Sequence, residues 1–313
     1  MDTVSRRDFV KKASVAGAGL TLAPSLTGHP LNLLHGEGNT WNIHFFSKHL
    51  QFLDYEEAAD ACTAAGMNGA DLTVRPGGHV LPENVERDLP LAVKAFRNAG
   101  LKIGMMVSGI TDPDDPLTEK VLRKASELGI KYYRLGNYSY DPGLSVVNNL
   151  EKIKVKMSGL AHLNEKYKIH GAYQNHAGSN FGAPVWDLWE VIKDMDPEWT
   201  GCQYDVRHAT VEGNRSWPLG MKLLKDHIRC MVIKDFTWGE TDGNAREINM
   251  PIGEGVVDFE AYFKLVKALG IHGPITMHLE YEMFPEKEMT LAQKKERAIK
   301  LMKKDLDALN LYL

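Results

Sequence analysis

An alternation of short apolar segments with longer amphipathic segments, repeated eight times from Trp41 to the C-terminus, constrains the fold most strongly. The apolar segments are typical of buried parallel strands. The segments between them have helical spacing, and several are followed by a glycine, which favours helix termination. Repeats of about 30 residues, each pairing a strand with a helix, predict an α/β fold of about 250 residues, the (β/α)8 TIM barrel, in a single domain.

The boundaries of the repeats can be placed from the sequence. The expected strands are Trp41–Ser47, Gly69–Val74, Leu101–Val107, Lys131–Leu135, Ile169–Gln174, Thr200–Asp205, Ile228–Lys234 and Pro274–Glu280. The expected helices are Tyr55–Ala65, Pro82–Ala99, Pro116–Leu128, Ser145–Tyr167, Val185–Asp194, Trp217–Asp226, Val256–Leu269 and Thr290–Leu309. A doubly wound open sheet is disfavoured because no Gly-x-Gly-x-x-Gly joins a strand to a helix. We therefore expect no nucleotide cofactor.

Composition excludes several classes of protein. The 313 residues are 43% hydrophobic and 25% charged, which is ordinary for a globular protein and not for a disordered or coiled-coil chain. The net charge of −4 and the lack of a long basic run argue against nucleic-acid binding. Side-chain alternation puts Cys202 and Cys230 on opposite faces of their strands, so all three cysteines are expected to be buried thiols.

The first 40 residues differ in character from the repeats. A charged start is followed by a short, weakly apolar stretch of small residues, which is the layout of an export signal. The run Ser5-Arg-Arg-Asp-Phe-Val-Lys11 resembles the twin-arginine signal pattern, and Gly17, Gly19 and Pro24 disfavour the alternative of an N-terminal helix. The stretch from 13 to 34 is a poor membrane span, so none is expected. We predict a signal over 1–27, a linker over 28–40 and a catalytic domain over 41–313.

The twin-arginine resemblance implies that the protein passes through the twin-arginine export machinery. It is then expected in the periplasm or at the cell surface.

Polar side chains gather where the expected strands end, which is where (β/α)8 barrels hold their chemistry. The ends of strands five to eight contribute, in order, Gln174 and His176, Asp205 and His208, Lys234, and His278 and Glu280. Residues two apart share one face of a strand, so an acid, a base and a cation are expected around one cavity.

Other strand ends add groups suited to a ligand. Arg75 and His79 flank a Pro-Gly-Gly turn after strand two, Arg134 lies at the end of strand four, and Trp238 follows strand seven. Arginine presents a planar fork of donors for carboxylates, phosphates or paired hydroxyls. Aromatic faces beside polar groups suit a polyhydroxylated ligand. We expect these four residues, with His176 and His278, to bind a small carbohydrate.

The ordered phrases at these strand ends resemble the xylose isomerase-like barrel family, also called sugar phosphate isomerases/epimerases, over roughly residues 40–310. The phrases are Tyr173-Gln-Asn-His176, Tyr204-Asp-Val-Arg-His208, Val232-Ile-Lys-Asp235 and His278-Leu-Glu280. The resemblance implies a TIM barrel and a divalent metal held by Glu, Asp, His and Glu from strands five to eight.

Only half of the metal ligands that the resemblance implies are present. Asp205 and Glu280 match, whereas Gln174 stands in place of the first Glu and Val232 in place of the His. Gln174 can still offer an amide oxygen, and His176 or His208 a ring nitrogen. Oxygen ligands suit Mg²⁺ or Mn²⁺, and imidazole tilts the choice toward Zn²⁺ or Co²⁺.

Enolisation explains why these residue types belong together. Removing a proton beside a carbonyl needs a base, for which Glu280 and His208 are candidates, and the enediolate needs positive charge. Lys234 can replace or supplement a metal as that charge. This chemistry predicts an isomerase or epimerase. The alternatives are a lyase that eliminates a group from 3-keto-glycosides and a non-catalytic sugar-binding barrel.

Export and the family name point to different substrates. Free sugar phosphates are scarce outside the cytoplasm, so the predicted signal favours a non-phosphorylated sugar. The segment Phe236–Glu254 is expected to be a long glycine-rich loop, either a lid or a subunit contact in a homo-oligomer.

Overall fold

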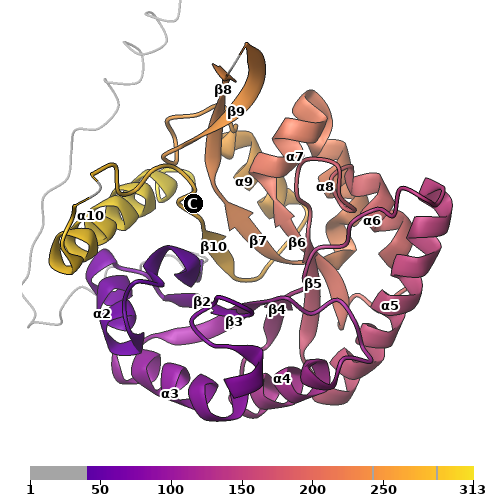
Figure 1. Ribbon diagram of the computed structural model, residues 1–313. Helices are drawn as coiled ribbons and strands as arrows, with labels where there is room; N and C mark the ends of the chain where they lie inside the picture. The colour runs from indigo at the N-terminus through magenta and orange to yellow at the C-terminus, as the bar shows by residue number, and fades with distance from the viewer. Residues whose placement is uncertain (1–40, 242, 287) are drawn as a thin grey trace, which may run out of the picture. The chain divides into compact units, whose positions relative to one another are not determined.

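The structure, a computed structural model, describes residues 41–241, 243–286 and 288–313. The predicted signal (1–27) and linker (28–40) lie outside the described residues. Eight parallel strands form the barrel (Figure 1). They are β1 (Ile43–Phe46), β2 (Gly69–Val74), β3 (Lys102–Ser108), β4 (Tyr132–Arg134), β5 (His170–Gln174), β6 (Thr200–Asp205), β7 (Ile228–Ile233) and β10 (Ile275–Met277).

The strands close into a barrel in the order β1-β10-β7-β6-β5-β4-β3-β2. Closure rests on the pairing of the first strand with the last, in which Ile43 lies opposite Ile275 and Phe45 opposite Met277. The (β/α)8 TIM barrel predicted from the repeats is therefore confirmed. Because every strand is parallel, all eight carboxyl ends open on the same side of the barrel.

Helices surround the barrel (Figure 1). They are α2 (Tyr55–Ala65), α3 (Val85–Asn98), α4 (Pro116–Glu127), α5 (Val146–Tyr167), α6 (Val185–Ile192), α7 (Val206–Gly213), α8 (Trp217–Leu224), α9 (Phe259–Ala268) and α10 (Leu291–Leu309). Their ends follow ordinary capping chemistry. Asp54 and Glu57 form a capping box at the start of α2, and Gly66 ends that helix with φ 83°.

Two elements were not expected from the repeat pattern. The first is α7, which begins directly after β6 because the Asp205 side chain accepts a hydrogen bond from the His208 backbone N–H and so caps the helix. The second is a hairpin in place of the long loop expected over 236–254. Its strands, β8 (Asp235–Thr241) and β9 (Asn244–Met250), pair antiparallel and leave the barrel after β7 (Figure 1).

One buried carboxylate holds the base of this hairpin. Asp235 accepts hydrogen bonds from the backbone N–H groups of Phe236 (2.8 Å), Gly253 (3.0 Å), Gly255 (2.9 Å) and Val257 (3.2 Å). A Cβ at Gly255 would lie 2.2 Å from Asp235 Oδ1, so the close approach requires glycine there. Asp235 therefore braces the chain between β7 and α9.

Apolar side chains fill the space between strands and helices, including Tyr204, Tyr262 and Phe45. Cys62, Cys202 and Cys230 are free and buried, as predicted. Cys230 packs inside the barrel with Met105 and Ala172, whereas Cys202 packs in the outer core, which confirms their opposite directions. In the part of the chain that the structure describes, none of the helices has the length and apolar character needed to cross a membrane.

Candidate active site

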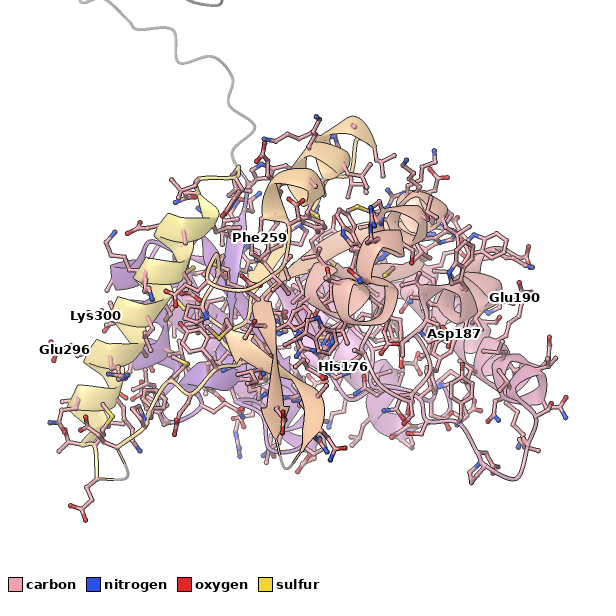
Figure 2. The ribbon with its side chains drawn as sticks, turned by 90° about the horizontal axis from the view of Figure 1, so that it is seen from above. His176, Asp187, Glu190, Phe259, Glu296 and Lys300 are labelled. Atoms are coloured by element: carbon pink, nitrogen blue, oxygen red, sulfur yellow. The ribbon has the colours of Figure 1, made fainter. Side chains whose placement is uncertain are left out.

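A polar cavity of about 180 Å³ opens at the carboxyl ends of the barrel strands. Its walls come from β1, β2, β4, β5, β7 and β10 and the residues that follow them. The lining residues are Phe46, Lys48, Arg75, Arg134, Asn137, Gln174, His176, Lys234, His278 and Glu280. Figure 2 shows His176 near the middle of the molecule, whereas Glu296 and Lys300 lie on helix α10 at the left.

A relay of hydrogen bonds forms the floor of this cavity. Arg134 Nη1 donates to Gln174 Oε1 at 2.6 Å, and Gln174 Nε2 donates to Asp205 Oδ2 at 2.7 Å. Because an arginine can only donate, it fixes the Gln174 amide with its oxygen toward Arg134 and its NH₂ group toward Asp205. Asn175 completes the frame by bonding to both the backbone N–H and the carbonyl of Asp205.

Lys234 lies at the centre of the floor. Its Nζ is 3.1 Å from Asp205 Oδ2 and 2.7 Å from His208 Nε2, and the residue is 4% exposed. Burial lowers the pKa of the ammonium below its usual value, and the Asp205 carboxylate limits that decrease. The arrangement presents a fixed positive charge to whatever occupies the cavity.

His176 and His208 form a pair beside Lys234. Their ring centroids are 3.9 Å apart, and His208 Nδ1 is 3.1 Å from Arg207 Nη1. Burial, with Lys234 and the other cationic neighbours, holds the pKa of His208 well below its usual value. Burial and Lys234 also lower the pKa of His176. Both imidazoles are therefore uncharged at neutral pH, and only His176 lines the cavity.

Glu280 stands on the opposite side of Lys234 from the histidine pair. Its Oε2 is 2.9 Å from Lys48 Nζ and its Oε1 is 3.6 Å from His278 Nδ1. Burial alone raises the pKa of this carboxyl, but the contacts with His278, His49 and Lys234 lower it by more, so Glu280 stays ionised. His278 in turn stacks on Phe46, with centroids 4.2 Å apart, and burial lowers its pKa to about 3.

Asp71 lies beneath the cavity inside the barrel. It is fully buried, and neither carboxylate oxygen has a hydrogen-bond partner among the described residues. Burial raises its pKa to about 7, although the Arg134 guanidinium opposes the shift. The carboxyl is therefore protonated in the folded protein over a pH range in which it is ionised in the unfolded chain.

This difference predicts that stability falls as pH rises. A carboxyl with a raised folded-state pKa contributes fully below its unfolded pKa, and its contribution is lost as pH rises through the folded pKa. Between pH 5 and pH 8.5 we expect the free energy of unfolding to fall by about 3 kcal/mol more in the native protein than in Asp71→Asn. Urea unfolding at both pH values measures it, with exposed Asp226→Asn as control. Equal losses in the native protein and Asp71→Asn would contradict the assignment.

The cavity contains most of the site residues predicted from the sequence, and Asp205 lies directly below it. Three predicted residues lie elsewhere. His79 bonds to Ser47, Thr73 and the Leu50 carbonyl, and so fastens the turn after β2. His208 is behind His176. Trp238 is 54% exposed on the hairpin and packs edge-on against Phe236.

Three lining residues were not singled out from the sequence: Phe46, Lys48 and Asn137. Phe46 is the last residue of β1, and Lys48 follows it on a short 3-10 helix over Ser47–Leu50. Lys48 and Asn137 lie two and three residues past the ends of β1 and β4, the same offsets as His176 and His208 from β5 and β6. A lysine and an asparagine in a connection are usually solvated, so their residue types alone do not mark them as site residues.

A second, larger cavity adjoins the first. It has a volume of about 390 Å³ and is lined by Lys48, His49, Gln51, Phe52, Leu279, Glu280, Tyr281, Met283 and Phe284. Lys48 and Glu280 line both cavities, so their ion pair stands between them. The outer cavity is largely aromatic and apolar, in contrast to the charged inner one.

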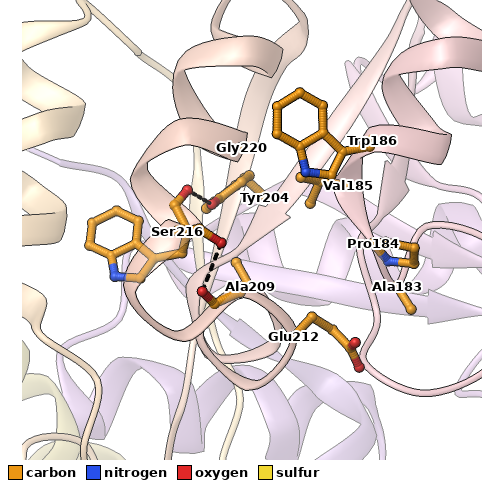
Figure 3. A pocket seen from close by; sticks show the side chains of 11 residues that line it. Ala183, Pro184, Val185, Trp186, Tyr204, Ala209, Glu212, Ser216 and Gly220 are labelled. Atoms are coloured by element: carbon orange, nitrogen blue, oxygen red, sulfur yellow. Dashed lines mark hydrogen bonds between the residues drawn. The ribbon is translucent and has the colours of Figure 1, made fainter.

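A third cavity lies outside the barrel among α6, α7 and α8 (Figure 3). Its volume is about 90 Å³, and the hydrogen bonds around it, from Tyr204 to the Trp217 carbonyl and from Ser216 to the Gly213 carbonyl, hold the helices together. Glu212 is the only acid that lines it and no lining residue is basic, so the chemistry belongs to the inner cavity.

A closed parallel barrel with a charged cavity at the carboxyl ends of its strands defines this protein as a TIM-barrel protein with its site in the position usual for that fold. Residues 59–304 match the model of the xylose isomerase-like TIM barrel family, and the chain belongs to that family. No curated protein matched the chain.

Solved structures share the fold at low sequence identity. The 3-keto-D-glucoside 4-epimerase of E. coli is 12% identical with a TM-score of 0.62, covering 84% of this chain and 99% of that one. The D-allulose 3-epimerase of a Methylomonas species is 16% identical with a TM-score of 0.63, covering 87% and 97%. The IOLI protein, whose structure contains a zinc atom, is 18% identical with a TM-score of 0.68, covering 87% and 99%.

One similar structure contains a zinc atom, which raises the question of whether the side chains at this site can bind a metal ion. Among the residues that the structure describes, no group of three or more His, Cys, Asp or Glu side chains is arranged to hold a metal ion. Gln174 turns its NH₂ group toward Asp205, and Lys234 occupies the other side of the same carboxylate oxygen. Val232 has no donor. The residues therefore do not fit a divalent metal, and Lys234 supplies positive charge beside Asp205.

Proposed function

We propose that this chain is a carbohydrate isomerase or epimerase that removes a proton beside the carbonyl of a non-phosphorylated sugar. The observation that carries the proposal is the buried Lys234 ammonium at the centre of a TIM-barrel cavity, with a proton acceptor on either side of it. The epimerases with a similar fold support the class of reaction.

Lys234 stabilises the charge that develops when the sugar enolises. An enediolate oxygen placed beside Nζ gains a charge-assisted hydrogen bond in a site that excludes most water. Since Asp205 already holds the ammonium in place, little reorganisation is needed when the negative charge forms. Gln174, fixed by Arg134, keeps Asp205 directed toward Lys234.

Two groups are positioned to move the proton. Glu280 follows β10 and His176 follows β5, and the barrel order places β7, which leads into Lys234, between those two strands. An epimerase needs a proton acceptor and a donor on opposite faces of a planar intermediate. Glu280 is ionised and accepts the proton from the sugar, and His176, which is uncharged and first takes up a proton from solvent, donates that proton to the other face. Glu280 then releases its proton to solvent, which restores both groups, and His208 acts as a positioning residue behind His176.

The outer cavity favours a second candidate function. A volume of about 390 Å³ beside the inner site accommodates a group attached to the sugar, and its aromatic walls include Phe52, Tyr281 and Phe284. The same enolisation applied to a 3-keto-glycoside would eliminate that group, which is the lyase reaction. Release of a coloured aglycone from a nitrophenyl 3-keto-glycoside distinguishes the lyase from the isomerase.

Solvent exchange tests the proposed reaction. The purified chain is incubated in D₂O with a panel of free, keto and acidic sugars, with and without Mn²⁺, and deuterium uptake is followed by NMR. We expect uptake into at least one sugar without added metal and no stimulation by Mn²⁺. No uptake into any sugar would instead support a non-catalytic sugar-binding barrel, and uptake only with Mn²⁺ would overturn the role of Lys234.

We also propose that the protein works outside the cytoplasm, on the basis of the twin-arginine pattern in its first 27 residues. Fusing residues 1–40 to a reporter that is active only after export tests this, with Arg6→Lys/Arg7→Lys as the matched control. Export that persists in the control would contradict it.

A further inference from the structure

We propose that the substrate carries a carboxylate and that Arg75 and Arg134 bind it, so that the substrate class is a sugar acid rather than a neutral sugar. This inference deepens the proposed function and rests on it for the assignment of the cavity as a substrate site. It begins with the balance of charge around the cavity and with which of those charges are already paired.

Cationic groups outnumber carboxylates at this site. Among the described residues the cations are Lys48, Arg75, Arg134, Lys234 and Arg207, and the carboxylates are Asp71, Asp205, Glu247 and Glu280. Lys48 is paired with Glu280, and Lys234 with Asp205. Arg207 is 3.9 Å from Glu247, bonds to Asn249 of the hairpin and lies over the Phe236 ring. Arg75 and Arg134 also feel Glu280, and Arg134 feels Asp205, but each of these carboxylates is already paired with a lysine, which leaves Asp71 as the acidic neighbour without a cation of its own.

Asp71 does not satisfy either guanidinium. It accepts no hydrogen bond from either arginine, and its pKa of about 7 leaves it partly protonated at neutral pH. The two arginines therefore keep a positive charge that the protein's own carboxylates do not balance. Both arginines are half-buried, and a positive charge that is partly removed from water and left unpaired favours a ligand of opposite sign.

The two guanidinium groups are arranged as a clamp. Each lies over the ring of Phe46 with its Cζ 5.7 Å from the ring centroid. Arg134 uses Nη1 for Gln174, and its buried Nε has no partner among the described residues. The Arg75 guanidinium donates no hydrogen bond to a described residue. Both therefore line the cavity with N–H groups that are free to donate.

The geometry favours a carboxylate over other ligand groups. A guanidinium binds a planar carboxylate through two parallel hydrogen bonds, and paired arginines hold it from two directions. The Phe46 ring lies against both guanidinium groups and keeps them on the same side of the cavity. A single sugar acid in the inner cavity would then place its carboxylate at Arg75 and Arg134 and its carbonyl carbon toward Lys234.

Calorimetric titration with matched sugars tests the inference. The probes are D-galacturonate and D-glucuronate, the neutral sugars D-galactose and D-glucose, and D-glucose 6-phosphate. We expect each uronate to bind at least tenfold more tightly than its neutral counterpart and more tightly than the phosphate. Equal binding of neutral sugars would overturn the proposal, and tighter binding of the phosphate would overturn the choice of a carboxylate.

Variants of Arg75 test whether the preference for uronates depends on the two arginines. Arg75→Met should weaken uronate binding between tenfold and a hundredfold and weaken neutral-sugar binding much less, and Arg75→Lys should restore part of the loss of uronate binding. The exposed Arg215→Met is the control and should bind like the native protein. If Arg75→Met weakens uronates and neutral sugars equally, or changes neither, the clamp is wrong.

Binding and exchange separate this inference from the proposed function. If the protein prefers uronates but exchanges no sugar proton, the carboxylate site is supported and the isomerase assignment is wrong. If it exchanges protons equally well in neutral sugars and in uronates, the isomerase assignment is supported and the carboxylate site is wrong.

Discussion

Lys234→Met is expected to slow deuterium uptake into the sugar that the native protein exchanges by a factor of about 100 to 1,000, the cost of removing one preorganised stabiliser of an oxyanion. Methionine has a similar length and no charge, so the enediolate would form beside an apolar group. NMR of the exchanging position measures the rate. An exposed lysine, Lys225→Met, is the matched control and should exchange at the native rate.

Loss of stability must be separated from loss of catalysis in this variant. Removing Lys234 leaves the fully buried Asp205 carboxylate without its cation, which we expect to cost about 3 to 5 kcal/mol. The double variant Lys234→Met/Asp205→Asn removes both charges and should regain much of that stability while remaining inactive. Native-like exchange in either folded variant would show that Lys234 is not the stabilising charge.

Asp235→Ala is expected to lower the free energy of unfolding by about 3 to 5 kcal/mol, because it leaves four backbone N–H groups at the base of the hairpin without an acceptor. Urea unfolding measures the change. The control is Asp258→Ala at the start of α9, where the carboxylate accepts one backbone hydrogen bond, from Ala261, and about 1 kcal/mol is expected.

The two aspartates form a matched pair. Both lie in the segment between β7 and α9 and accept backbone hydrogen bonds, and they differ in the number of hydrogen bonds accepted. If Asp235→Ala costs no more than Asp258→Ala, then Asp235 does not brace the hairpin. Asp235→Asn should fall between the two, since an amide keeps one acceptor oxygen and replaces the other with a donor.

The barrel itself could be predicted because its signals are local. Each strand is a short apolar run and each helix has its own cap and glycine stop, as at Asp54 and Gly66, so no long-range contact was needed to recognise the repeats. The polar groups at the strand ends followed from side-chain alternation. Gln174, Asp205 and Lys234 do share one side of their strands, as expected.

The parts that could not be predicted depend on contacts between distant residues. The base of the hairpin is held by the bonds of Asp235 to Gly253 and Gly255, eighteen and twenty residues away, and no local pattern in the sequence predicts them. Helix α7 was missed because Asp205 was interpreted only as a site residue, although the same side chain is also a helix cap. Lys48 could be recognised as a site residue only from its ion pair with Glu280, which lies 232 residues later in the chain.

The relay from Arg134 through Gln174 to Asp205 also bears on how such a site changes during evolution. Gln174→Glu alone would place a second carboxylate against Asp205 in place of the amide that now donates to it, and Val232→His alone would add an imidazole with no metal to bind. Each single exchange is therefore unfavourable, whereas the combined exchange is not. Relatives of this chain should accordingly carry glutamine at position 174 and valine at position 232 together, and lose them together.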